Sequence, residues 1–217
     1  MTDNTIVQTT LVLLLASGAV SYGQREANSP KSAEKLVERG MKRFRDNKIA
    51  ESIADFEAAA KRDPKLRPHL WQLGISYYYA GKFLQGKRLF ESHRTVNPHD
   101  VENAAWHFLC AARAEGLESA QKKILPIETR RDTRIPMAEV YALYSGKGTA
   151  DDVLAAAAKA GTARAKMYAH LYVGLYDEVT GKTKEAREHL RQAAAVPLKN
   201  HYMHDVARVH LLQRDWK

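Results

Sequence analysis

Apolar side chains recur at helical spacing along most of the chain that follows residue 33. Tyr168, Tyr172 and Tyr176 recur every four residues, and side chains four residues apart share one face of an α-helix. No segment shows a pattern that we assign to a strand. The sequence therefore predicts an all-α protein of about ten helices.

The chain also repeats itself with a period of 34 residues. Three pairs of identical residues share this separation: Gly40 with Gly74, Phe56 with Phe90, and Pro64 with Pro98. A small residue in the first helix of a unit lets the second helix cross closely, and the aromatic ring fills the gap between them. Proline ends the unit because it cannot continue a helix. Units of this kind bury their apolar faces by stacking, so the pattern predicts an α-solenoid.

The helical domain is predicted to span residues 33–215. Its expected segments are regular helix–turn–helix repeats at 33–64, 67–98 and 167–198, degenerate helical pairs at 101–161, and a closing helix at 202–214. In the first repeat Arg39 and Arg43 stand where apolar residues are expected. Such a substitution suits a terminal repeat with one face in water.

The motif Leu70-x-x-Leu73-Gly74-x-x-Tyr77 resembles the tetratricopeptide repeat (TPR), a helix–turn–helix unit of 34 residues. The C-terminal half, from IPMAEVYALYSGKGTADDVLAAA to HYMHDVARVHL, resembles the distal half of the NlpI-type repeat proteins of bacterial envelopes. This resemblance implies a non-enzymatic adaptor, often a dimer, that binds envelope proteases or peptidoglycan hydrolases.

The N-terminal segment 1–23 is predicted to be a signal peptide, followed by a linker at 24–32. The apolar run LVLLLASGAV at 11–20 is too short to span a bilayer, which needs about 20 residues, but it suits the apolar region of an exported chain. The first ten residues carry no Lys or Arg, so a short buried helix or a cytosolic N-terminus is the alternative. We expect export to the periplasm or beyond, and no lipid anchor, because no cysteine lies near residue 23.

The chain is basic, with 34 Lys and Arg against 25 Asp and Glu and a formal net charge of +9. The basic residues are dispersed and interleaved with acids, for example in KRFR at 42–45, KRDPKLR at 61–67 and RRDTR at 130–134. Nucleic-acid binding would favour a concentrated basic stripe. Nucleic acid is therefore the less favoured partner, although a basic protein that binds a polyanion, nucleic acid or an anionic glycan, remains the alternative function.

The sequence has no residue pattern typical of a catalytic site. The single cysteine, Cys110, lies in the apolar stretch FLCAA and is expected to be buried and inert; one cysteine also excludes an internal disulfide. His201, His204, Asp205 and His210 cluster in the sequence, but without an established ligand spacing. There is no nucleophile elbow, P-loop or dinucleotide fingerprint. We therefore expect no enzyme activity, no cofactor and no metal site.

A partner-binding groove is the better candidate, because the first helices of stacked repeats line a concave surface. By repeat position, the residues expected to face it are Met41, Phe44, Arg45, Trp71, Ile75, Tyr78 and Tyr79. An aromatic groove with cationic edges suits a protein or peptide partner. The alternative is that these rings pack against the following helix pair.

The same positional reasoning argues against one kind of partner. Repeat domains that hold a peptide's terminal carboxylate use Lys and Asn at defined groove positions. Here those positions carry Val37, Met41, Gln72, Glu102 and Trp106, which offer no cation. Capture of a chaperone C-terminus is therefore disfavoured.

Overall fold

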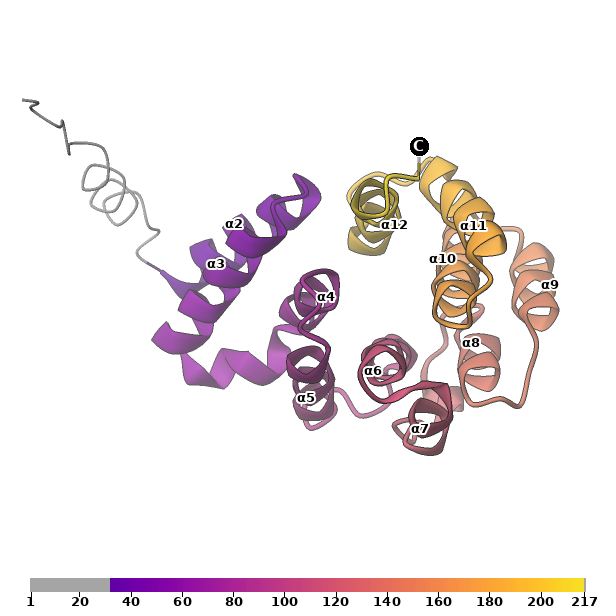
Figure 1. The fold of residues 1–217 in the computed structure, drawn as a ribbon, viewed down its shortest axis with the longest axis horizontal. Helices are drawn as coiled ribbons and strands as arrows, with labels where there is room; N and C mark the ends of the chain where they lie inside the picture. The colour runs from indigo at the N-terminus through magenta and orange to yellow at the C-terminus, as the bar shows by residue number, and fades with distance from the viewer. Residues whose placement is uncertain (1–31, 217) are drawn as a thin grey trace, which may run out of the picture. The chain divides into compact units, whose positions relative to one another are not determined.

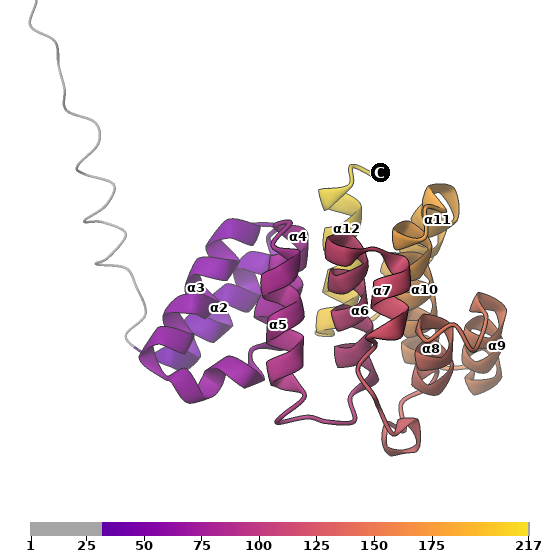
Figure 2. The same cartoon turned by 60° about the horizontal axis from the view of Figure 1, so that its bottom comes forward.

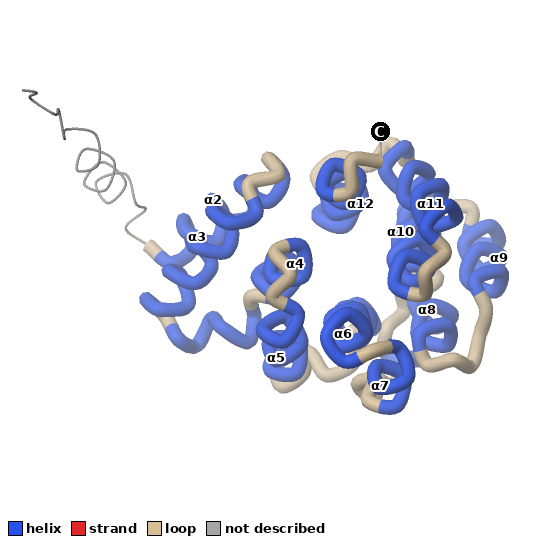
Figure 3. Tube along the Cα trace, viewed as in Figure 1, coloured by secondary structure: helices blue, strands red, loops and turns tan. Residues whose placement is uncertain are grey.

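The computed structural model describes residues 32–216, which form helices and loops only (Figures 1 and 3). This part of the chain has eleven α-helices and two short 3₁₀ helices. The prediction of an all-α protein is confirmed for these residues. The predicted signal peptide at 1–23 and all of the linker at 24–32 except its last residue lie outside them.

The α-helices pack mainly as neighbours in chain order. The pairs are α2 (Ala33–Arg45) with α3 (Ile49–Arg62), α4 (Trp71–Tyr79) with α5 (Phe83–His93), α6 (Val101–Glu115) with α7 (Leu117–Lys122), α8 (Met137–Tyr144) with α9 (Ala150–Ala160), and α10 (Ala163–Val179) with α11 (Thr183–Ala195). The last helix is α12 (Tyr202–Gln213), and the 3₁₀ helices Pro64–His69 and Thr129–Arg131 lie in connections.

In four of these pairs the first helix ends in the same tight turn. In each turn one residue has a positive φ: Asn47 (60°), Gly81 (70°), Gly146 (72°) and Gly181 (87°). Glycine and asparagine tolerate this left-handed conformation best. The turn explains why Gly81 and Gly181 recur in corresponding places, and it shows that asparagine takes the role in the first pair.

The glycines of the repeat lie where the two helices of a pair approach most closely. A Cβ added to Gly74 would lie 2.6 Å from the ring of Phe90, and one on Gly40 would lie 3.0 Å from the ring of Phe56. Both rings are buried. The structure thus supports the physical reason given for the 34-residue spacing: a residue without a side chain makes room for the ring opposite.

Arg39 and Arg43, the two arginines at expected apolar positions of the first pair, both form ion pairs with the buried Asp55. Arg39 Nη2 lies 2.6 Å from Asp55 Oδ1, and Arg43 Nη1 lies 2.7 Å from Asp55 Oδ2. The Asp55 side chain on α3 is 3% exposed, while both arginines keep about a third of their surface in water. This face of the first pair is therefore polar and partly wet, as expected for a terminal unit.

Helix α12 returns across the chain to meet the first pair. In Figure 1 the helices α2, α4, α6 and α10 form an arc, and α12 lies on its inner side, next to α10 and opposite α4. Figure 2 shows the same arrangement from another side. Helix α12 contacts α2 as well as its sequence neighbour α11. Residues from the two ends of the domain therefore lie against one another. None of the described helices has the length and apolar character needed to cross a membrane.

Candidate partner-binding site

The seven predicted groove residues lie on α2 and α4. They divide by burial: Phe44, Ile75, Tyr78 and Tyr79 are buried, whereas Met41, Arg45 and Trp71 are half-buried. A partner can reach only the second group without rearrangement. The four buried residues belong to the core, so only part of the predicted set forms a surface.

Helix α12 supplies much of the cover over these residues. The Tyr202 ring stacks on Phe44 with ring centroids 5.2 Å apart, and it meets Trp71 edge-on at 5.1 Å. Further along α12, His210 Nδ1 lies 3.1 Å from the Tyr79 hydroxyl. The sequence predicted that these aromatic residues face a groove, but it did not predict that the closing helix would pack on Phe44, Trp71 and Tyr79.

Two polar contacts continue the interface between α12 and α2 to the ends of these helices. The Arg208 guanidinium donates to the Arg45 carbonyl oxygen at 2.7 Å, and the Gln213 amide donates to Asn47 Oδ1 at 2.6 Å. Both join residues more than 160 positions apart in the chain. They fix the position of α12 relative to the first helical pair.

A buried carboxylate, Glu178 on α10, anchors the other side of α12. It accepts a hydrogen bond from the Tyr78 hydroxyl at 3.2 Å and ion-pairs with Arg113 at 3.5 Å and with Arg214 just after α12. His210 Nε2 lies 3.6 Å away. Burial disfavours the charged form of Glu178, but His210 and Arg214 outweigh it and hold its pKa well below the ordinary value. Glu178 is thus a structural counter-ion.

A second polar cluster surrounds Arg134, in the loop before α8. Its guanidinium pairs with Asp100 at 2.5 Å, with Asp132 at 2.6 Å, and with Glu102. The Tyr172 hydroxyl donates to Glu102 at 2.6 Å. Burial raises the pKa of Glu102 to about 7, against the attraction of Arg134. Because three carboxylates share one guanidinium, the cluster is an acidic spot in a basic protein.

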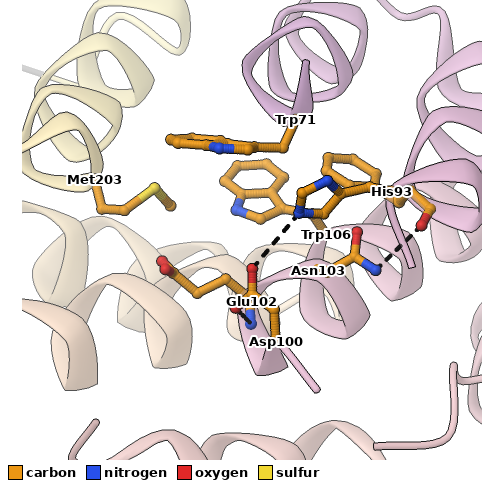
Figure 4. Close-up of a pocket in the computed structure, with 8 residues that line it drawn as sticks. Trp71, His93, Asp100, Glu102, Asn103, Trp106 and Met203 are labelled. Atoms are coloured by element: carbon orange, nitrogen blue, oxygen red, sulfur yellow. Dashed lines mark hydrogen bonds and ion pairs between the residues drawn. The ribbon is translucent and has the colours of Figure 1, made fainter. Parts of the chain in front are cut away.

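A small cavity of about 30 Å³ lies beside this acidic cluster, between α4, α5, α6 and α12. Seven of its lining side chains are labelled in Figure 4 and carry its chemistry: Trp71, His93, Asp100, Glu102, Asn103, Trp106 and Met203. The volume is enough for a water molecule or a group of similar size. It is a small cavity whose lining is mostly apolar but includes several polar side chains.

Sequence reasoning identified part of this cavity. Trp71 was expected to turn toward the inner face, and Trp106 was assigned to a groove position; both line the cavity. His93 and Asn103 were missed, although each lies in a helix that the repeat period locates. Met203 could not have been found from the pattern, because its place depends on the return of α12.

The residues considered for other chemistry have structural surroundings. Cys110 is fully buried, and burial raises its thiol pKa, so the thiol stays protonated. His204 Nε2 lies 2.9 Å from the Ala194 carbonyl oxygen, while the His201 ring packs edge-on against Tyr168. Within residues 32–216 no group of three or more His, Cys, Asp or Glu side chains is arranged so that it could hold a metal ion.

Comparison with known proteins does not assign the chain. It matches no protein-family model and no curated protein. The class of the protein therefore rests on its repeat pattern and on the geometry described above.

Proposed function

We propose that the chain is a non-catalytic scaffold that binds a partner protein or peptide on the inner face of a TPR-type α-solenoid. The 34-residue spacing and the close glycine–ring crossings at Gly40 and Gly74 support this architecture. Stacked helical pairs present an extended surface, and such surfaces are used for binding.

The proposal rests mainly on the position of α12, which packs against α2 and α4. An amphipathic helix lies on the aromatic side chains of α2 and α4, with Tyr202 between Phe44 and Trp71. This is the way in which helical partners are held in grooves: apolar anchors on one helix face enter aromatic recesses. The inner face thus has the shape and the chemistry to hold a helix.

The surface open to a partner is the strip of half-buried side chains on α2 and α4 that lies beside α12. We call it the inner rim and define it by Val37, Met41, Arg45, Trp71 and Gln72. The Gln72 amide lies 3.6 Å from Met41 Sδ, so the strip is continuous from one helix to the next. A partner segment would bind here, alongside α12.

The pairing of basic side chains supports a protein partner over a polyanion. In the KRFR segment Lys42 pairs with Asp46 at 2.5 Å and Arg43 pairs with Asp55. In the RRDTR segment Arg134 is neutralised by three carboxylates. Cations with protein counter-ions release few counterions on binding a polyanion. A steep salt dependence of nucleic-acid or glycan binding would favour the alternative function.

The resemblance to the NlpI-type proteins gives the proposal its cellular setting. An envelope protease or a peptidoglycan hydrolase would be the partner, and the scaffold would act as a dimer. N-terminal sequencing of the native protein tests export, because a chain starting at Gln24 has lost its signal peptide. Light scattering of the purified protein tests dimerisation.

Affinity capture from a cell-envelope fraction tests the scaffold role. Met41→Glu places a charge in the inner rim, and Leu84→Glu is the matched control, because Leu84 is 50% exposed on α5. We expect the wild type and Leu84→Glu to retain the same partner and Met41→Glu to lose it. If the wild type retains nothing, or both variants retain the partner equally, the proposal is wrong.

A further inference from the structure

We propose that the cavity beside Arg134 binds the ammonium tip of a lysine side chain supplied by the partner. This inference rests on the proposed scaffold function and names the contact that would anchor the partner. We call the site the lysine pocket and define it by Trp71, His93, Asp100, Asn103 and Trp106.

Two buried side chains present hydrogen-bond acceptors that the protein leaves unused. His93 Nδ1 lies 2.7 Å from the Pro68 carbonyl oxygen, so this nitrogen donates, and in the tautomer with its proton on Nδ1 the other nitrogen, Nε2, is an acceptor. The Asn103 amide nitrogen donates to the Phe90 carbonyl oxygen at 3.1 Å, which fixes the orientation of the amide. His93 Nε2 and Asn103 Oδ1 are buried without a hydrogen-bond partner.

Unused buried acceptors are costly unless a donor reaches them. His93 and Asn103 are 5% and 2% exposed, so bulk water does not solvate these atoms freely. Asp100 Oδ2 lies 3.9 Å from His93 Nε2, a separation that a donor can bridge. An ammonium group brings three N–H donors and no acceptor, which suits these three atoms.

The local charge favours a cation. Asp100, Glu102 and Asp132 share the single positive charge of Arg134, so the cluster has a formal charge of −2 when Glu102 is ionised and of −1 when Glu102 is protonated. In a chain of net charge +9 this is an acidic spot. A buried cation is stable only beside such compensating charge.

Aromatic faces and size select the kind of cation. The indoles of Trp71 and Trp106 border the cavity in Figure 4, and indole faces attract cations more strongly than other rings do. The volume of about 30 Å³ suits a compact ammonium. A planar guanidinium or a quaternary ammonium needs more room, so lysine is favoured over arginine or a methylated lysine.

The pocket can be reached from the inner rim. Trp71 belongs to the rim and is half-buried, and the Asp100 and Glu102 side chains are 16% and 15% exposed. The lysine methylenes would lie along Trp71 while the ammonium enters below it. Lysine side chains bury their methylenes in this manner while the charged end reaches a polar environment.

Water is the competing occupant. Trp106 Nε1 is a buried donor without a partner, and a water molecule could accept from it while donating to Asn103 Oδ1. The two occupants differ in charge, and so a charged probe and a neutral probe of the same size distinguish them.

Titration followed by the indole N–H signals of the full-length chain tests the proposal. The probe is n-butylammonium, which reproduces the end of a lysine side chain, and 1-butanol is its neutral counterpart. Trp→Phe substitutions assign the three indole signals. We expect n-butylammonium to shift the Trp71 and Trp106 signals saturably, and 1-butanol to leave them unchanged. Equal responses to both probes, or no response, would overturn the proposal in favour of an apolar or a water-filled cavity.

A matched pair of variants tests the role of charge. Asp100 and Asp63 both cap a helix, and each accepts a hydrogen bond from the backbone N–H two residues ahead. Asparagine caps as well as aspartate does, so both Asp→Asn variants should fold. We expect Asp100→Asn to weaken n-butylammonium binding at least tenfold and Asp63→Asn to leave it unchanged. Equal binding by all three proteins would contradict the proposal.

Met203→Lys provides a second test from within the chain. Met203 lines the cavity and is 4% exposed, so a lysine here would place its own ammonium in the pocket. We expect a folded protein whose indole signals no longer respond to the probe. A variant that unfolds, or one that still binds the probe, would argue against the site. None of these measurements involves the partner, so failure here is distinct from failure of the capture experiment.

Discussion

Gly74→Ala tests whether the close approach of helices creates the 34-residue repeat. The added Cβ would lie 2.6 Å from Cζ and 2.8 Å from Cε2 of Phe90. Ordinary contacts of this kind are at least 3.4 Å long, so the ring would have to move by several tenths of an ångström. Phe90 is 1% exposed and cannot swing into solvent.

Two opposing effects set the magnitude. Alanine is favoured over glycine within a helix by about 1 kcal/mol, whereas overpacking a core costs about 1–3 kcal/mol. Taking about 2 kcal/mol for the overpacking, we expect Gly74→Ala to lower the free energy of unfolding by about 1 kcal/mol. Phe90→Leu removes the ring atoms that would clash. In that background Gly74→Ala should instead raise the free energy of unfolding by about 1 kcal/mol.

Urea unfolding followed by circular dichroism measures all four proteins of this double-mutant cycle. The coupling between the two substitutions should be about 2 kcal/mol, within the usual range for residues in contact. Ala155→Gly on the exposed face of α9 is the control. It should lower the free energy of unfolding by about 1 kcal/mol through helix propensity alone. If Gly74→Ala has the same sign in both backgrounds, the packing argument is wrong.

Three further predictions concern α12, the acidic cluster and the thiol. Tyr202→Ala should lower the free energy of unfolding by about 3 kcal/mol, because it removes the ring stacked on Phe44. Tyr202→Phe should leave the free energy of unfolding almost unchanged, because the buried hydroxyl has no hydrogen-bond partner. Urea unfolding of both variants tests this difference. The Glu102 pKa is raised from 4.5 to about 7 in the folded state, so its contribution is present below pH 4.5 and lost as the pH rises to 7. Relative to Glu102→Gln, the wild type should therefore lose on the order of 2 kcal/mol across this range in pH-dependent unfolding. The buried Cys110 should not react with a thiol reagent until the protein unfolds, and fast reaction of the native protein would contradict its burial.

The sequence predicted local structure well because local structure depends on neighbouring residues. The glycine–ring pairs at Gly40 and Gly74 leave a signal that recurs after one period. The 3₁₀ helix Pro64–His69 between the first two pairs left no such signal. The pattern treated it as the junction between repeats.

The candidate site was predictable only in part, for a reason of distance along the chain. The groove positions of Trp71 and Trp106 follow from the repeat. The burial of Phe44 and Tyr79 depends on α12, which contacts them from more than 130 residues away in sequence. A periodic pattern shows that α12 has an apolar face, but it does not show which surface that face covers.

The return of α12 to the first helical pair is the central claim, and nuclear Overhauser effects between aromatic rings test it most directly. The rings of Phe44 and Tyr202 have centroids 5.2 Å apart, so their protons should show strong cross-peaks in the full-length protein. Tyr202→Ala supplies the assignment, because it must abolish them. Absence of these cross-peaks, together with a solvent-exposed Tyr202 ring, would show that α12 does not occupy the inner face.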